Sequence, residues 1–258
     1  MRQRYRVQFP PHTGGLSQDE AFFNLLEGER TLRIRFHDYH EIYRRPGLYE
    51  QVFYERLKCN SPDVLSESLA RAVQAEGGSL SQLRVLDLGA GNGAMGEKLA
   101  ARGVSRVVGA DIIPEAREAA LRDRPGVYDE YYVGDFAQLS PTQREAVAAW
   151  HVDAVTCVAA LGFGDIPPAT FFRALEFVAE GGWVAFNIKE TFLDRSDESG
   201  FSRLIRELIF SEYLDVHHLQ RYRHRLSMEG LPLFYFALVG RKVKNIPEDF
   251  LTRCEISS

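Results

Sequence analysis

Three acidic residues that could bind a ligand each lie at or near the end of a short apolar run. Asp87 precedes the turn Gly89–Gly93, in which glycine alternates with other residues, while Asp111 and Asp135 end the next two apolar runs. Glycines allow a tight turn and let a ligand lie against the main chain, because no Cβ stands in the way. The helix expected after the turn would offer free N–H groups and a positive dipole end. This pattern predicts a binding site for a small polar ligand.

The spacing of these acids favours a nucleoside that also carries a cation. A dinucleotide site usually has G-x-G-x-x-G under a pyrophosphate, whereas here G-x-G-x-G follows directly on Asp87, whose carboxylate suits an ammonium group better. Asp111 could accept both ribose hydroxyls. Asp135 could accept the adenine amino group while Phe136 covers the ring. Together they outline S-adenosylmethionine (SAM). A nicotinamide or flavin cofactor, or a glycine turn kept only for packing, are the weaker alternatives.

The elements that must position these acids alternate between strand and helix. This alternation predicts parallel βαβ crossovers with helices on both faces of the sheet, closed by an antiparallel hairpin. We therefore expect a Rossmann-like α/β three-layer sandwich with a seven-stranded, mainly parallel sheet, and we assign to this fold class the strand order 3-2-1-4-5-7-6. The expected strands are 83–88, 106–110, 131–133, 153–161 and 183–188, followed by the hairpin 219–226 and 233–239.

The segment before this alternation shows no strand pattern. Residues 16–26 read as a helix, and residues 31–57, rich in aromatic and charged side chains, read as two short helices divided by Pro46 and Gly47. The sequence therefore predicts an N-terminal helical lid over the strand ends. The expected divisions are an arm and lid at 1–60, a SAM-binding domain at 61–245 and a tail at 246–258.

Several segments resemble the successive motifs of class I SAM-dependent methyltransferases. They are VLDLGAGNG, GADIIPEA, YYVGDF, DAVTCVAALGFGDIPP and GGWVAFNIKE. Within that class the likeness is to the small-molecule methyltransferases related to the Williams–Beuren-region methyltransferase-like protein, and it covers Gly47 to Lys189. Glu50 stands where such proteins usually have Asp. Residues 1–40 and the hairpin, on the side expected to hold the methyl acceptor, resemble nothing recognisable.

The resemblance implies roles for individual residues. Gly89, Ala90 and Gly91 would line the methionine portion of SAM. Asp111 and Ile112 would hold the ribose and the adenine edge, and Asp135 with Phe136 the adenine. Ala159 and Leu161 would lie under the sulfonium, and Tyr49 would cap the site. The implied product is S-adenosylhomocysteine (SAH).

Methyl transfer from a sulfonium needs the donor and the acceptor to be aligned and water to be excluded. An oxygen acceptor can also need a base that removes its proton. Asp165 follows the fourth expected strand on the catalytic edge, and His37 and His40 lie three residues apart. These three are the catalytic candidates. Each has a plainer alternative: Asp165 as a helix-capping loop acid, and the histidines as surface or packing residues. No metal site is expected, because the H-x-x-H pair lacks a third ligand nearby.

Composition narrows the function classes. The chain has 258 residues, 45% hydrophobic, with a net charge of −5 and three scattered cysteines. We therefore expect a cytoplasmic monomer or homodimer that acts on a small-molecule acceptor at oxygen or nitrogen, with nucleic acid an unlikely partner and no membrane attachment. The alternatives are a methyltransferase for protein or nucleic acid, and a non-catalytic SAM-binding protein. The expected strand 219–226 carries alternating arginines at positions 221, 223 and 225 (Arg221, Arg223 and Arg225). They could form a basic row for a macromolecular acceptor, or they could prevent pairing with another sheet at an exposed edge.

Overall fold

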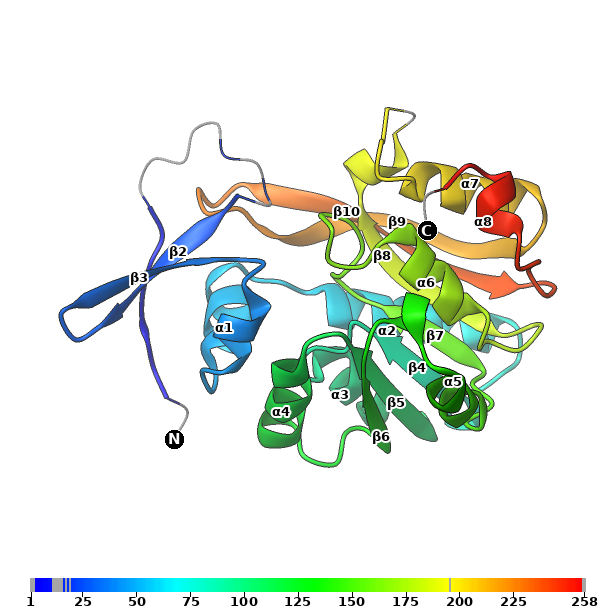
Figure 1. Cartoon of the computed structure of the whole chain (residues 1–258), viewed down its shortest axis with the longest axis horizontal. Coiled ribbons are helices and arrows are strands. Elements are labelled where there is room, and N and C mark those ends of the chain that lie inside the picture. The colour runs from blue at the N-terminus through cyan, green and yellow to red at the C-terminus, as the bar shows by residue number, and fades with distance from the viewer. Residues whose placement is uncertain (1–2, 11–15, 17, 19, 195, 257–258) are drawn as a thin grey trace.

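The computed structural model of the protein describes residues 3–10, 16, 18, 20–194 and 196–256. Within these ranges the chain forms a large sheet flanked by helices and a smaller N-terminal sheet beside it (Figure 1). Residues 1, 2 and 11–15 of the expected N-terminal arm, and residues 17 and 19 of the expected first helix, lie outside the described part.

Seven strands form the main sheet in the order β6-β5-β4-β7-β8-β10-β9. The first five along the chain are parallel, and β10 runs antiparallel to both β8 and β9. Numbered within this sheet alone, the order is 3-2-1-4-5-7-6, so the predicted topology is confirmed. The strands are β4 (Arg84–Leu88), β5 (Arg106–Asp111), β6 (Glu130–Val133), β7 (Ala154–Cys157), β8 (Trp183–Lys189), β9 (Leu214–Leu226) and β10 (Pro232–Lys242).

Helices cover both faces of this sheet, which makes three layers. One apolar core lies under α5 (Pro141–Ala148), α6 (Pro168–Leu175) and α7 (Phe201–Phe210). On the other face, α2 (Ser61–Ala75) and α3 (Ala94–Ala101) bury a second core, and α4 (Pro114–Asp123) packs a row of alanines against Tyr131 of β6. The short α8 (Phe250–Arg253) joins the first core, where Phe250 stacks on Phe172. Short 3-10 turns are η2 (Leu80–Gln82), η3 (Phe136–Gln138) and η4 (Glu190–Leu193).

The N-terminal segment differs from the prediction of an all-helical lid. It contains a three-stranded antiparallel sheet of β1 (Arg6–Gln8), β2 (Phe22–Glu27) and β3 (Arg30–Arg35), so the helix expected over residues 16–26 is wrong. Phe23 and Leu25 are fully buried while their neighbours are partly exposed, which is the period-two pattern of a strand. Glu27 pairs with Arg30, and Gly28 at φ +61° opens the two-residue turn between them.

Two short helical pieces lie on either side of Pro46 and Gly47, as expected, but residues 31–35, which were expected to be helical, belong to β3. The two pieces are α1 (Tyr39–Tyr43) and the π-helical turn η1 (Glu50–Arg56). Their apolar side chains share one core with the small sheet, and Met228 from the β9–β10 turn packs against it. We call residues up to Asn60 the lid, because this unit lies beside the end of the β9–β10 hairpin and over the edge of the main sheet (Figure 1). Among the described residues, no helix combines the length and apolarity that crossing a membrane requires.

Candidate active site

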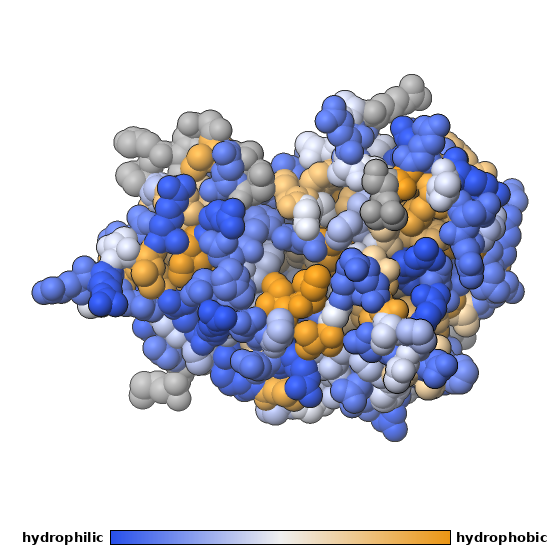
Figure 2. Space-filling view, viewed as in Figure 1, coloured by the Kyte–Doolittle hydropathy of each residue, from blue (hydrophilic) through white to orange (hydrophobic). Residues whose placement is uncertain are grey.

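The carboxyl ends of the parallel strands open into a cavity of about 380 Å³, which we call the main cavity. Small-molecule sites commonly measure roughly 300–1,000 Å³. Its walls come from the ends of β4, β5 and β7, the loops after them, and the lid. Figure 2 shows hydrophobic side chains gathered in the hollow between the lid and the main sheet. Of the residues singled out from the sequence, the main cavity is lined by His37, Tyr49, Gly89, Asp111, Ile112, Asp135, Ala159 and Asp165.

The glycine turn forms a close-fitting floor beside this cavity. Gly89 and Gly91 have φ angles of +69° and +54°, which side chains rarely adopt. A Cβ on Gly89 would lie 2.8 Å from that of Ala160, and one on Gly91 would lie 2.5 Å from the Tyr43 hydroxyl. Gly89, Ala90 and Gly91 line a smaller adjoining space of about 30 Å³, the glycine cavity, which shares Tyr43 and Tyr49 with the main cavity. This turn therefore needs glycine for both its backbone angles and its space.

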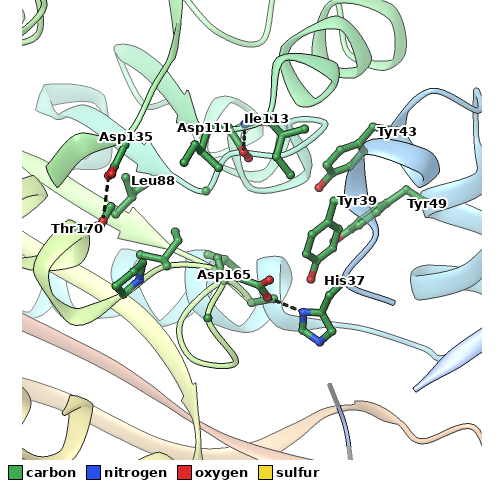
Figure 3. Close-up of a pocket in the computed structure, with 18 residues that line it drawn as sticks. His37, Tyr39, Tyr43, Tyr49, Leu88, Asp111, Ile113, Asp135, Asp165 and Thr170 are labelled. Atoms are coloured by element: carbon green, nitrogen blue, oxygen red, sulfur yellow. Dashed lines mark hydrogen bonds and ion pairs between the residues drawn. The ribbon is translucent and has the colours of Figure 1, made fainter. Parts of the chain in front are cut away.

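Asp111 is fixed by main-chain donors at the end of β5. Its Oδ2 accepts a hydrogen bond from the Gly91 N–H at 2.9 Å, and its Oδ1 accepts one from the Ile113 N–H at 3.0 Å. Burial raises the pKa of this carboxyl, although the backbone donors oppose the rise. Each carboxylate oxygen keeps a lone pair for a further donor. The side chain turns toward the main cavity (Figure 3), so a ligand hydroxyl can reach it.

Asp87 lies behind the turn and lines none of these cavities. Its two oxygens accept hydrogen bonds from the Thr156 and Tyr128 hydroxyls, each at 2.7 Å. Burial raises its pKa to about 6, against the opposing effect of both hydroxyls. This position fits a residue that fixes β4 against β7 and Tyr128. Direct contact with a ligand ammonium, expected from the sequence, finds no support in the cavity lining.

Asp135 also lines the main cavity, and Thr170 holds it there (Figure 3). Asp135 Oδ1 accepts from the Ala137 N–H at 2.9 Å and from the Thr170 hydroxyl at 3.2 Å. Phe136, expected to cover an adenine ring, points instead into the core under α6, where it meets Phe177 edge-on. The apolar surface of the main cavity comes from other residues, including Leu88, Ile112, Ile113 and Ile166.

Stacked tyrosines of the lid form the wall opposite the strand ends (Figure 3). The ring centroids of Tyr39 and Tyr43 are 5.9 Å apart, and those of Tyr43 and Tyr49 are 5.2 Å apart. Burial raises the pKa of all three phenols, so they are neutral. Aromatic faces attract cations through their quadrupole. This wall therefore suits a ligand with a positively charged centre, such as a sulfonium.

The loop after β7 is held in a strained conformation. Ala159 has φ +56°. It lines the main cavity, the glycine cavity and a third small cavity beside the β9–β10 hairpin, which is described below. Its N–H donates to Asn187 Oδ1 at 2.6 Å, and the Asn187 amide donates to the Tyr222 hydroxyl at 2.7 Å. Strain of this kind persists where the surroundings fix it, commonly at functional sites. Asn187 of β8 was missed in the sequence, where it is one polar residue within an apolar strand.

The structure brings together two of the three catalytic candidates. Nδ1 of His37 lies 2.7 Å from Oδ2 of Asp165 (Figure 3). His37 comes from the lid and Asp165 from the loop after β7, so the pair joins the two parts of the fold across the cavity. His40 does not join them. It is half exposed, lies 3.6 Å from Glu41, and lines none of these cavities.

A third space of about 30 Å³, the hairpin cavity, lies between the lid and the β9–β10 hairpin. It shares His37, Tyr39 and Asp165 with the main cavity, and it also contains Leu161, which was expected near the sulfonium. Its other polar lining groups are Gln18, Cys59, His224, Arg225 and Tyr235. None of these was a sequence candidate for the site, and Arg225 was noted only as part of the arginine row. Gln18, His224, Arg225 and Tyr235 lie in the first 40 residues or in the hairpin, which resemble no known motif. Among the described residues, no three His, Cys, Asp or Glu side chains gather as a metal site would require.

Comparison with known proteins agrees with this geometry. Residues 57–231 match the model of a family described as a methyltransferase domain. No protein of curated function matches the chain. The fold is similar to the N-methyltransferase NodS of Bradyrhizobium japonicum in complex with SAH, with 15% identity, a TM-score of 0.54, and coverage of 81% of this chain and 98% of that one.

Two further solved structures share the fold. The magnesium protoporphyrin IX methyltransferase of Synechocystis with bound SAM gives 17% identity, a TM-score of 0.50, and coverage of 74% of this chain and 88% of that one. A candidate RNA methyltransferase of Pyrococcus horikoshii gives 17% identity, a TM-score of 0.51, and coverage of 70% and 84%. At these identities the structures show the fold alone, while the family match spans more than half of the chain. The protein belongs to the methyltransferase domain family and is a SAM-dependent methyltransferase.

Proposed function

We propose that the protein transfers the methyl group of SAM to an oxygen or nitrogen of a small organic molecule. The observation that carries this proposal is the enclosure of the acceptor side. The hairpin cavity is small and lies between the lid and the β9–β10 hairpin, so only a small group of the acceptor has room between them. The likeness of several motifs to the Williams–Beuren-region group of small-molecule methyltransferases supports the same acceptor class.

The alternative of a protein or nucleic acid acceptor has less support. The net charge is −5. The arginine row on the edge strand β9 is broken up, because Arg221 pairs with Glu190 at 2.8 Å and Arg225 is buried. Arg223 alone of the three is both exposed and without an ion pair among the described residues. A single exposed cation offers little to a polyanion.

The residues around the main and glycine cavities fit SAM. We propose that Asp111 accepts the ribose hydroxyls, that Asp135 accepts the adenine amino group, and that Ile112 packs on the adenine edge. The backbone from Gly89 to Gly91 lies against the methionine portion, and Tyr49 with Ala159 flanks the sulfonium. In this proposal Asp87, Phe136 and Leu161 act indirectly: Asp87 fixes the turn from behind, Phe136 fixes η3 against the core, and Leu161 belongs to the acceptor side.

SAM, when bound, supplies an electrophilic methyl group whose carbon–sulfur bond breaks, with its electron pair left on sulfur, as the acceptor's lone pair forms the new bond. We propose that His37 removes the acceptor's proton through Nε2, since Nδ1 is engaged by Asp165. Asp165 holds the ring in place through its contact with Nδ1. The tyrosine wall excludes water from the methyl group. His40, away from the cavities, has no part in this step.

The experiment compares His37→Asn and Asp165→Asn with the control His40→Ala. With an acceptor found by screening, we expect kcat to fall by roughly 100-fold or more in the first two variants, the usual contribution of general-base catalysis. SAM affinity should stay within about twofold of the parent in all three, and His40→Ala should be fully active. Equal kcat in His37→Asn and the parent would exclude His37 as the base. Turnover on RNA or protein alone, with no small molecule accepted, would overturn the proposed acceptor class.

A further inference from the structure

Arg225 on β9 is a buried cation without a counterion among the described residues. It is 4% exposed. Its guanidinium makes one hydrogen bond, from Nη1 to the carbonyl of Leu226 at 3.0 Å, and lies 5.4 Å from the centre of the Phe36 ring. Guanidinium has five N–H donors, so most of them have no acceptor within the described part of the chain. Burying an unpaired charge is costly, which indicates that a ligand supplies the anion.

An irregularity in the hairpin turns this one arginine inward. Along β9, Arg225 pairs with Leu233 of β10 and Arg223 pairs with the next residue, Phe234, so His224 is an extra residue between them. Such a bulge re-aims the side chains that follow it. Arg223 stays exposed, whereas Arg225 is buried and lines the hairpin cavity. Arg223 and Arg225, only two positions apart, therefore lie in different environments, one in solvent and the other in the hairpin cavity.

Gln18 provides an independent sign of a missing partner in the same cavity. Its amide Nε2 donates to the Tyr235 hydroxyl at 2.9 Å, but its Oε1 is buried and has no hydrogen-bond partner among the residues that the structure describes. Buried polar atoms are nearly always paired, and an exception needs a reason. Gln18 and Arg225 both line the hairpin cavity. Two buried polar side chains whose hydrogen-bonding capacity is only partly used by the described residues thus face one small space.

We propose that the methyl acceptor is a carboxylic acid whose carboxylate pairs with Arg225 in the hairpin cavity. This inference rests on the proposed small-molecule methyltransferase function. The acceptor's hydroxyl or amino group lies toward His37 and Asp165, which line both this cavity and the main cavity. That group loses a proton and gains the methyl, while the carboxylate is unchanged and serves as the anchor. Planar guanidinium matches a carboxylate with two parallel hydrogen bonds.

The size of the cavity favours a carboxylate over a phosphate. It measures about 30 Å³, and one water molecule needs roughly 10–15 Å³ on this scale. A carboxylate places only two oxygens beside Arg225. A phosphate is tetrahedral and bulkier, so it would force the lid away from the hairpin.

Direct binding is tested by thermal unfolding of the protein saturated with SAH. Acetate and benzoate are added, with acetamide and benzamide as neutral partners, phosphate as a second anion, and ionic strength held constant with chloride. We expect Tm to rise with carboxylate concentration and to be unchanged by the amides. The rise should vanish in Arg225→Gln, return in part in Arg225→Lys, and persist in Arg223→Gln, the exposed control on the same strand. No carboxylate effect, or one with phosphate alone, would overturn the proposal.

Turnover gives the second readout. Hydroxy- and amino-carboxylic acids are assayed with labelled SAM, each beside its primary amide. We expect methylation of acids only, and a fall in kcat/KM on the order of 100-fold in Arg225→Gln, mostly through KM, because a charged hydrogen-bonded pair is lost. Equal use of acid and amide would contradict the proposal.

Two controls distinguish a failure of the carboxylate site from a failure of the proposed function and from a structural role of Arg225. Calorimetry should show unchanged SAH affinity in Arg225→Gln; if the parent itself does not bind SAH, the proposed function fails rather than the carboxylate site. Without ligand, Arg225→Met should be as stable as the parent or more so, because an unpaired buried charge has been removed. A large loss of stability would indicate that Arg225 supports the fold instead.

Discussion

Replacing Gly91 by alanine tests the fit between the glycine turn and the tyrosine wall. Gly91 has φ +54°, where a Cβ costs about 1–2 kcal/mol. The added methyl would also lie 2.5 Å from the Tyr43 hydroxyl and 3.3 Å from its ring carbon Cζ, so the ring must move. Tyr43 lines both the main and the glycine cavities. We therefore expect a loss of SAM affinity of at least about tenfold, equivalent to about 1.4 kcal/mol, beyond the cost to stability.

Gly103→Ala is the matched control. Gly103 also has a positive φ, +82°, but nothing lies within 4 Å of where its Cβ would be. It should therefore show a similar loss of stability from backbone strain with unchanged SAM affinity. Denaturant unfolding measures the first effect, and calorimetric titration with SAM measures the second. If Gly91→Ala binds SAM within about twofold of the parent, the close approach of ligand, turn and Tyr43 is wrong.

Two further predictions concern the strand-end acids. Asp111→Asn should weaken SAM binding by about 10- to 100-fold, because hydrogen bonds to a charged group are lost. Glu118→Gln, at an exposed position of α4, should leave SAM binding unchanged. Calorimetry checks both, and equal affinities of Asp111→Asn and the parent would remove Asp111 from the site. Burial raises the pKa of Asp87 from 3.8 to about 6, so folding favours its protonated form, and its contribution to stability is full below about pH 4 and lost as pH rises through 6. Asp87→Asn cannot ionise, and its stability relative to the parent should therefore rise by roughly 2.4 kcal/mol between pH 4 and pH 7. Denaturant unfolding at both pH values checks this, and a difference that stayed constant would contradict it.

The main sheet was predictable because each signal was local. Apolar runs ended at glycine or aspartate, and helices began at Ser or Pro and closed at Gly, so parallel crossover connections were expected. The strand order came with the fold class to which these signals pointed. In the lid the same reading failed. The helix-capping pattern at residues 16–26 was given more weight than the alternation of Phe23 and Leu25, and than Gly28 in a two-residue turn.

The site was predictable only in part, for a related reason. The glycine turn, Asp111 and Asp135 stand at strand ends, and parallel strands bring their carboxyl ends together. The pairing of His37 with Asp165 depends on how the lid docks, and the burial of Arg225 depends on one bulge in the hairpin. Neither is encoded in local spacing. Phe136 shows the converse, since its position beside Asp135 in the chain did not place its ring in the cavity.

Calorimetric titration of the parent protein with SAM, and then with SAH, tests the central claim most directly. The account predicts one site that binds both ligands with micromolar affinity, because the main and glycine cavities hold the nucleoside and methionine portions common to the two. Absence of binding heat at several temperatures, in protein shown by circular dichroism to be folded, would contradict the placement of the cofactor between the strand ends and the lid.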